Sequence, residues 1–342
     1  MDLGLSDEQR QLVASFTNLL SKSSSAEQVR AAEPAGFDEA LWRTLLDTGA
    51  VTMGVAESQG GWGASLLDLA LVAEQVGRAL APAPVIEAQV AARLLADVAS
   101  PPALAALEPA LAGEQMITLA VRPARDGTAP LTPAGAVCDA VVVLDGERLA
   151  LVPVADGARR PVANLAAAPL ADLDLVGGTT LAAGGAAVDR FDAALDEWLV
   201  LTAAALVGIG AAALDLGCAY ATERTAFGAP IGTFQGVAHP LADDATHLDG
   251  ARLLAHEAAW ALDERADRGR ELAAMAFAFA SRTAEAATYD ALHVHGGYGF
   301  MLEYDVQLHY RRARGWARVW GDADAADRRA AAARYPTATG GR

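Results

Sequence analysis

The stretch Arg224-Thr225-Ala226-Phe227-Gly228-Ala229-Pro230-Ile231-Gly232-Thr233-Phe234-Gln235-Gly236-Val237-Ala238-His239 lies between two long alanine-rich segments of helical periodicity. Its Gly and Pro residues interrupt that period briefly, so we expect a helix end near Thr225, a tight loop and a new helix from Thr233. An Arg and a Phe before such a loop suit a ligand with a pyrophosphate and a flat ring. They also fit an ordinary corner between two helices.

The composition indicates a large folded protein with a strongly acidic surface. The 342 residues are 53% hydrophobic and rich in alanine, and the formal net charge of −17 argues against binding to nucleic acid or an anionic membrane. Cys138 and Cys218 offer neither metal spacing nor a disulfide framework. The opening residues do not resemble a signal peptide, and no apolar run looks long enough to span a bilayer. We expect a cytoplasmic protein with no metal site.

Periodicity predicts a mainly α fold with a small central β-domain. Residues 1–114 are expected to form a helical domain, with apolar faces along Phe37–Leu46 and Leu66–Leu80. In residues 115–190 short apolar runs replace the helical period, and Asp145-Gly146-Glu147 signals a hairpin. These runs are Met116–Val121, Ala136–Leu144, Leu149–Val154 and Leu173–Val176.

Residues 191–336 are expected to be helical again and to form a four-helix bundle with short connections. The four helices are expected at about 191–222, 233–264, 269–296 and 303–334.

A second block follows the first at some distance: His293-Val294-His295-Gly296-Gly297-Tyr298-Gly299-Phe300, then Glu303-Tyr304 and Arg311-Arg312-Ala313-Arg314. The first stretch resembles the Arg-x-x-Phe-Gly-x-Pro-Ile-x-x-Phe-Gln segment of acyl-CoA dehydrogenases, and this block resembles their Gln-x-x-Gly-Gly-x-Gly-Phe…Glu…Arg-Asp-Ala-Lys. The loop Glu57–Gly63 resembles a third family element. The resemblance covers nearly the whole chain and implies an N-terminal helical domain, a β-barrel or sheet domain and a C-terminal four-helix bundle.

The resemblance implies an FAD-dependent oxidoreductase that makes a 2,3-enoyl thioester from an acyl-CoA, with electron-transfer flavoprotein as acceptor. In that family a carboxylate removes the α-proton while the β-hydrogen leaves as hydride to the flavin. The ADP end of FAD is held largely by the neighbouring subunit through the two blocks. The matching positions, our candidate cofactor-binding residues, are Arg224, Phe227, Gln235, His293, Gly296 and Gly297. His293 replaces the family Gln and can still donate a hydrogen bond.

The positions that hold a subunit's own flavin do not match. The family's Thr-Glu-Pro-x-x-Gly-Ser-Asp corresponds to the segment 121–127, which reads Val-Arg-Pro-Ala-Arg-Asp-Gly and keeps only the proline. The side chain of Val121 cannot hydrogen-bond to a flavin. The following Trp-Ile-Thr/Ser segment of the family has no counterpart between Gly127 and Ala140.

The catalytic base does not match either. Trp320 occupies the usual position of the family glutamate, and Trp198 occupies the alternative position used by some relatives. Glu197 is adjacent to the second position, but one residue along a helix turns a side chain by about 100°. Asp322 lies two residues beyond the first. We therefore name no catalytic residue.

This chain keeps the residues that reach a neighbour's FAD and lacks those that hold its own. The pattern favours the non-catalytic subunit of a heteromeric α2β2 acyl-CoA dehydrogenase, acting with a catalytic partner on a fatty or sterol side-chain acyl-CoA. Two alternatives stay open. One is a self-sufficient enzyme with Glu197 or Asp322 as a displaced base, and the other is a flavin-free structural or binding protein on this fold.

Overall fold

The computed structural model describes residues 4–335. The expectation of no signal peptide rests partly on residues 1–3, which lie outside that range. The α-helices are α1 (Asp7–Ser23), α2 (Ala26–Ala32), α3 (Glu39–Asp47), α4 (Leu66–Arg78), α5 (Val85–Val98), α6 (Pro101–Leu111), α7 (Gly185–Glu223), α8 (Gln235–Asp263), α9 (Gly269–His295), α10 (Val306–Trp316) and α11 (Ala323–Arg334). The strands are β1 (Ile117–Leu119), β2 (Thr128–Thr132), β3 (Ala140–Asp145), β4 (Arg148–Pro153), β5 (Arg159–Pro161), β6 (Ala171–Asp174), β7 (Thr179–Ala183), β8 (Thr225–Ala226) and β9 (Ala229–Pro230).

The chain divides into two compact units. The bundle unit comprises Met1–Asn18, Ala70–Leu80 and Leu199–Arg342, and the sheet unit comprises Leu19–Leu69 and Ala81–Trp198. Three of the four boundaries between them fall inside α1, α4 and α7, and the fourth, after Leu80, lies between α4 and α5. The predicted division into three domains, at 1–114, 115–190 and 191–336, has different boundaries from these two units and stays a prediction.

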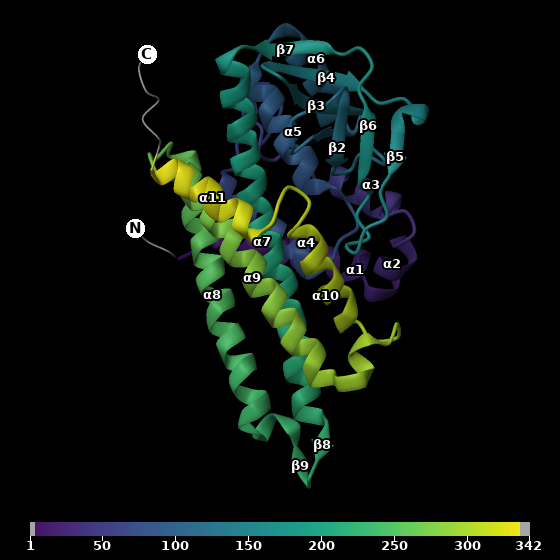
Figure 1. Cartoon of the computed structure of the whole chain (residues 1–342), viewed down its shortest axis with the longest axis vertical. Coiled ribbons are helices and arrows are strands. Elements are labelled where there is room, and N and C mark those ends of the chain that lie inside the picture. The colour runs from purple at the N-terminus through teal and green to yellow at the C-terminus, as the bar shows by residue number, and fades with distance from the viewer. Residues whose placement is uncertain (1–3, 336–342) are drawn as a thin grey trace. The chain divides into compact units, whose positions relative to one another are not determined.

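The bundle unit is built on three long helices. The part of α7 from Leu199 onward, α8 and α9 lie side by side, and α10 and α11 pack on α9 (Figure 1). The expected single helix at 303–334 is wrong, because α10 ends at Trp316 and α11 begins at Ala323. The side chain of Asp322 accepts a hydrogen bond from the backbone N–H of Ala325 at 2.8 Å and so caps a new helix.

The sheet unit contains a four-stranded sheet in the order β1-β3-β4-β7 and a three-stranded sheet in the order β2-β6-β5. The expected hairpin is confirmed, since β3 and β4 pair antiparallel up to Asp145 opposite Arg148. Gly146 in the intervening turn has a φ of 61°. The strands β2, β5 and β7 were not expected, and β5 lies at a sheet edge with two of its three residues exposed.

The helix α7 is apolar over most of its length. By length and composition it could cross a membrane, which the sequence analysis did not expect. In the fold, 72% of its most apolar 18-residue window is buried. A helix in the core of a folded protein can have the same length and apolar composition, so these properties of α7 are only weak evidence for a membrane span.

Within the bundle unit, α4 and α7 cross at backbone contact. A Cβ atom added to Gly77 would lie 1.9 Å from the carbonyl oxygen of Ala205, and one added to Gly208 would lie 2.0 Å from that of Glu74. Neither backbone oxygen can move aside without shifting its helix, so this crossing requires both glycines.

We predict that Gly208→Ala lowers the free energy of unfolding by about 1–3 kcal/mol, because the added methyl group forces two helices apart. Gly236→Ala is the matched control. Gly236 is an exposed residue of α8 with nothing within 4 Å of an added Cβ, so alanine there is expected to stabilise by up to about 1 kcal/mol. Urea unfolding measures both changes, and equal effects of the two variants would contradict the prediction.

Candidate functional site

The loop after α7 is a small hairpin with a strained tip. The strands β8 and β9 pair antiparallel around Phe227 and Gly228, whose φ angles are 52° and 80°. Positive φ at both central residues defines a type I′ turn, which normally carries Asn or Gly at the first position. A Phe in the left-handed region costs about 1–2 kcal/mol. The side chain of Phe227 is 99% exposed, and its ring lies edge-to-face with that of Phe234 at 6.2 Å between ring centroids.

The second block forms the end of α9 and the turn after it. Gly296 has φ 60° and ψ −138°, a backbone conformation that is almost restricted to glycine. A Cβ atom added to Gly296 or Gly297 would meet nothing within 4 Å, so the backbone of this turn is open to an approaching group.

A ring stack brings the two blocks together. Tyr220 lies one helical turn before Arg224 on α7, and its ring stacks on that of His295 at 4.3 Å. His295 immediately precedes Gly296 and is held by a hydrogen bond between its Nδ1 and the carbonyl oxygen of Ala291, at 2.7 Å. The sequence analysis missed Tyr220. Its position four residues before Arg224, on the same helix face, was the available signal.

All six candidate cofactor-binding residues are exposed. Within residues 4–335 the guanidinium of Arg224 and the side-chain amide of Gln235 have no hydrogen-bond or ion-pair partner, whereas His293 stacks on Tyr289 at 6.1 Å. A free guanidinium, a free amide, an open glycine turn and an exposed aromatic ring are the groups that bind a pyrophosphate and an adenine ring. These residues therefore fit the ADP half of FAD.

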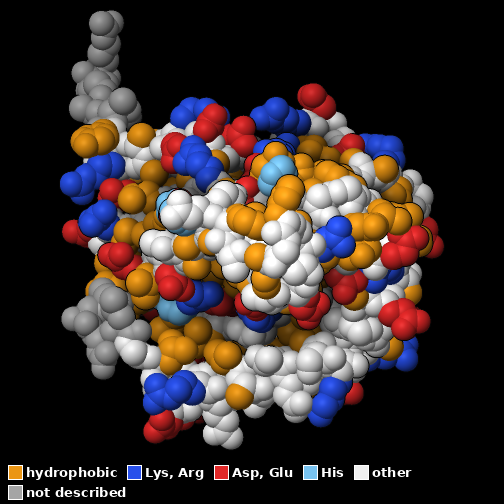
Figure 2. All heavy atoms as spheres, turned by 90° about the horizontal axis from the view of Figure 1, so that it is seen from below, with side chains coloured by type: hydrophobic (Ala, Val, Ile, Leu, Met, Phe, Trp, Pro, Cys, Tyr) orange, Lys and Arg blue, Asp and Glu red, His pale blue; other side chains and the backbone are white. Residues whose placement is uncertain are grey.

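Exposed apolar side chains are plentiful in the same segments. Figure 2 views the molecule from the side of the β8–β9 hairpin and shows apolar side chains gathered on that face. The large exposed apolar residues of the hairpin, the start of α8, the end of α9 and the following turn are Phe227, Phe234, Tyr289, Tyr298, Phe300, Met301 and Leu302. Contiguous exposed apolar surface of this kind marks interaction sites.

In the sheet unit, the alternative base position is filled by a buried indole. Trp198 is 2% exposed, and its Nε1 donates a hydrogen bond to Oε1 of Glu87 on α5 at 3.3 Å. Burial raises the pKa of Glu87, while the hydrogen bond from Trp198 opposes that shift. The sequence analysis did not identify Glu87, because nothing in the sequence indicated that α5 would face Trp198.

The two displaced-base candidates both have structural partners. Glu197 accepts hydrogen bonds from Nε and Nη2 of Arg93, at 2.8 and 3.0 Å, in a pair that is about four-fifths buried. Asp322 caps α11, and the backbone N–H of Ala325 lowers its pKa. Trp320, at the usual base position, packs on the edge of Phe277 at 6.1 Å in the bundle unit.

The segment that aligns with the flavin cradle follows β1. Val121 is buried, so its side chain presents no donor or acceptor. Arg122 beside it is half-buried, and its pKa is lowered by burial and by the like charge of Arg125. A half-buried guanidinium and a buried valine are a poor match for the hydroxyl-rich cradle that the family motif provides.

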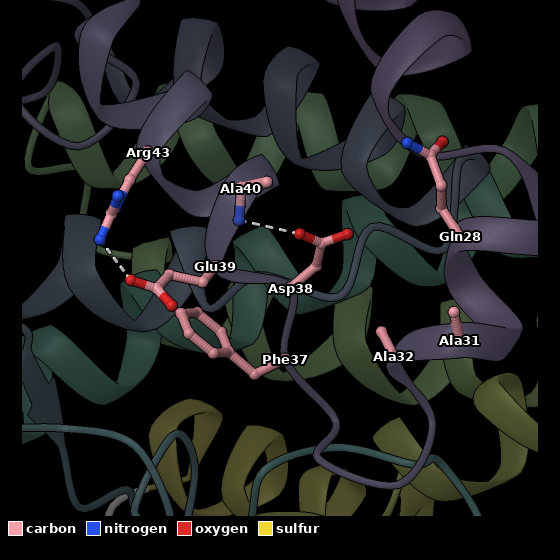
Figure 3. Close-up of a pocket in the computed structure, with 8 residues that line it drawn as sticks. All are labelled: Gln28, Ala31, Ala32, Phe37, Asp38, Glu39, Ala40 and Arg43. Atoms are coloured by element: carbon pink, nitrogen blue, oxygen red, sulfur yellow. Dashed lines mark hydrogen bonds and ion pairs between the residues drawn. The ribbon is translucent and has the colours of Figure 1, made fainter.

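A pocket of about 460 Å³ lies elsewhere, between α2 and α3 of the sheet unit (Figure 3). Asp38 accepts hydrogen bonds from the backbone N–H groups of Ala40 and Leu41 and caps α3, while Glu39 and Arg43 form an ion pair. Its ionisable side chains thus already have partners, and none of the candidate residues lines it. The lining residues are Gln28, Ala31, Ala32, Phe37, Asp38, Glu39, Ala40 and Arg43.

Comparison with known proteins identifies the fold and the family. Residues 6–113 match the acyl-CoA dehydrogenase N-terminal domain, and residues 189–334 match the acyl-CoA dehydrogenase C-terminal domain. The acyl-CoA dehydrogenase IpdE2 of Mycolicibacterium smegmatis is 32% identical over 325 residues, which cover 93% of this chain and 96% of that protein. The chain belongs to the acyl-CoA dehydrogenase family. Its members are flavoprotein oxidoreductases, and the fold class expected from the sequence is confirmed.

Further relatives and solved structures agree. Benzylmalonyl-CoA dehydrogenase of Aromatoleum aromaticum is 29% identical over 92% of this chain and 94% of its own. The ChsE4-ChsE5 complex of Mycobacterium tuberculosis contains a chain that is 25% identical and superposes with a TM-score of 0.88, over 98% of this chain and 100% of that one. Butyryl-CoA dehydrogenase of Megasphaera elsdenii, at 20% identity over 98% of this chain and 100% of its own, shares the fold with a TM-score of 0.86.

We predict that Glu197→Gln lowers the free energy of unfolding by about 1–3 kcal/mol, because it leaves the guanidinium of Arg93 without its carboxylate. The matched control is Asp322→Asn, which is expected to change stability by less than about 1 kcal/mol, since Asn caps a helix as well as Asp does. Denaturant unfolding measures both variants. A Glu197→Gln chain as stable as the wild type would mean that the ion pair with Arg93 has no structural role.

Proposed function

We propose that this chain is the subunit without a catalytic base in a heteromeric FAD-dependent acyl-CoA dehydrogenase, and that it completes the FAD site of a catalytic partner. The observation that carries the proposal is a contrast in hydrogen bonding. The donors of Arg224 and Gln235 are exposed and unused within the described chain, while the carboxylate of Glu197, nearest to a family base position, is fully engaged.

In this arrangement the six candidate residues act on the ADP half of a cofactor held mainly by the partner. Arg224 would pair with the pyrophosphate, and the open turn at Gly296 and Gly297 would let the backbone approach phosphate oxygens. Phe227 would pack on the adenine, and Gln235 and His293 would donate hydrogen bonds. The bound FAD would accept the hydride, while the partner would supply the base that removes the α-proton.

The relatives support the heteromeric part of the proposal. Two of the solved structures that superpose with a TM-score of 0.88 are two-component proteins, the ChsE4-ChsE5 complex and a Tcur3481-Tcur3483 steroid ACAD variant. We therefore propose an α2β2 assembly that acts on a bulky acyl-CoA such as a sterol side-chain thioester, with electron-transfer flavoprotein as acceptor, in the cytoplasm.

A self-sufficient enzyme is the alternative that a specific residue, Glu87, supports. Glu87 is a carboxyl group in contact with Trp198, at the alternative base position, and burial raises its pKa as a general base requires. Its hydrogen bond to the indole favours a filled pocket instead. A flavin-free binding protein, the other alternative, is not favoured by any particular contact in the described residues.

The first test is the visible absorption of the purified chain, alone and co-expressed with the product of an adjacent gene. We expect the chain alone to be colourless and the co-purified complex to be yellow, with about one FAD per two chains, since only half of the flavin cradles are intact. A chain that is yellow on its own and bleaches with an acyl-CoA would overturn the proposal. An absence of flavin from both samples would favour the flavin-free alternative.

A second prediction concerns the hairpin tip. Phe227→Ala is expected to weaken FAD retention by the complex about tenfold or more, because one buried aromatic contact is worth roughly 1.5–3 kcal/mol. In the isolated chain the same substitution is expected to change unfolding by less than about 1 kcal/mol, since the side chain is 99% exposed. Phe277→Ala is the control for packing and should cost about 3–5 kcal/mol. Unchanged FAD retention by the Phe227 variant would remove this residue from the proposed site.

A further inference from the structure

The interior of the bundle unit contains a carboxyl group that the proposed function does not use. Asp244 on α8 is only 4% exposed, and its Oδ2 atom is buried with no hydrogen-bond donor in contact. An ionised carboxylate in such a position is unstable, because it has lost its water without gaining a partner. The group must therefore be neutral or be charged at a large energetic cost.

The ionisable groups that act on Asp244 are acidic. Asp290 on α9 accepts a hydrogen bond from its carboxyl group, Asp243 adjoins it on α8, and Cys218 lies within electrostatic range on α7. Asp215, also on α7, acts on the same thiol and pairs with Arg78. None of the charged groups that act on Asp244 is a cation. A shared proton is the simplest way to keep two neighbouring carboxyl groups in contact.

We propose that Asp244 and Asp290 share one proton across the contact between α8 and α9, and that this pair is a pH-sensitive clamp in the bundle. With the proton present, a hydrogen bond joins the two helices. Without it, the buried charge of Asp244 faces the half-buried charge of Asp290, and their repulsion pushes α8 away from α9.

The clamp lies next to the candidate cofactor-binding residues, so its effect on them rests on the function proposed above. A Cβ atom added to Gly217 would lie 3.1 Å from Ala291, the neighbour of Asp290, and 3.6 Å from Leu241, one turn before Asp244. Tyr220, one turn further along α7, already stacks on His295. Separation of α8 from α9 at the carboxyl pair would therefore disturb the packing of α7 on α9 that holds the turn at Gly296.

The direction of the pH effect follows from the pKa values. Burial, and then the charges of Asp290 and Asp243, raise the pKa of Asp244 from 3.8 to about 7. A raised carboxyl pKa contributes stability below its unfolded value, and that contribution is lost as the pH rises through about 7. The half-buried imidazole of His256 and the buried imidazole of His309 act in the opposite direction. Burial lowers each pKa to about 4, so their contribution is lost as the pH falls from 6.5 toward 4.

The comparison of the wild type with Asp244→Asn isolates the carboxyl pair. At about pH 6.5 both histidines are still half protonated in the unfolded chain, but they contribute equally to the two proteins. The experiment is thermal unfolding of the full chain between about pH 6.5 and pH 8.5. We expect the carboxyl pair to lower the Tm of the wild type by roughly 1–2 °C across this range, against an opposite change from the histidines. Asp244→Asn, a neutral isostere that still donates to Asp290, should lose this slope and melt higher than the wild type at the upper end.

Asp243→Asn is the matched control, because it removes an exposed charge from the neighbouring position and should keep most of the slope. Infrared difference spectra at the lower end of the range give an independent readout. The wild type should show a protonated carboxylic acid band that is missing from Asp244→Asn. Equal slopes in the wild type and Asp244→Asn, or the absence of that band, would overturn the proposal.

The same variants in the co-purified complex separate the clamp from the proposed function. FAD release that increases above about pH 7 in the wild type and not in Asp244→Asn would support both. A slope in Tm without any pH dependence of FAD retention would support the clamp and overturn its link to the site. If no complex binds FAD, the proposed function fails, while the slope and the infrared band still decide the clamp.

Discussion

The bundle depends on how closely other helices approach α7. At Gly208 an added Cβ would lie 2.0 Å from a carbonyl oxygen of α4, and at Gly217 it would lie 3.1 Å from Ala291 of α9. Backbone contact of this kind fixes the level of each neighbour along α7, because no side chain can act as a variable spacer. Tyr220, near the end of α7, is therefore held against His295 at the end of α9.

Two carboxyl groups of the sheet unit have hydrogen-bond partners, whereas two donor side chains at the end of the bundle unit have none among the described residues. Inside the sheet unit, Glu197 has both oxygens bound by Arg93, and Glu87 accepts from Trp198. A general base needs a carboxylate whose lone pairs are available to the substrate, and both oxygens of Glu197 already accept hydrogen bonds from Arg93. At the end of the bundle the situation is reversed, since the donors of Arg224 and Gln235 have no acceptor among the described residues. This contrast is what supports the proposal that the chain binds the cofactor of a partner and supplies no base.

Helical periodicity predicted α7, α8 and α9 to within a few residues, because each buries a continuous apolar face. It failed at Asp322, where a capping side chain starts a new helix and so divides the expected last helix in two. The sequence analysis had considered Asp322 as a displaced base and not as a helix cap. The strands β2, β5 and β7 lack long apolar runs and form through pairing with distant strands, which periodicity cannot detect.

The candidate site was predictable only in part. The sequence motifs predicted the six candidate residues. The contact that joins the two motif-bearing segments, the stack of Tyr220 on His295, is part of no motif. The partners of Glu197 and Trp198 were equally hidden, because Arg93 and Glu87 come from α5, about a hundred residues away. Contacts between distant segments depend on the register of two helices, and a single sequence does not reveal that register.

Two features of the bundle unit destabilise the isolated chain, and no contact among its described residues compensates for them. Phe227 adopts a left-handed backbone conformation with its ring in solvent, and Asp244 sits in the interior without a donor. Local rules of folding are usually broken at functional positions, where another molecule or a change of state recovers the lost free energy. Phe227 would recover it by burial against a ligand or partner, and Asp244 by taking up a proton. Both lie on the segments that carry the candidate residues, so we infer that this end of the bundle is built for an interaction the isolated chain cannot complete.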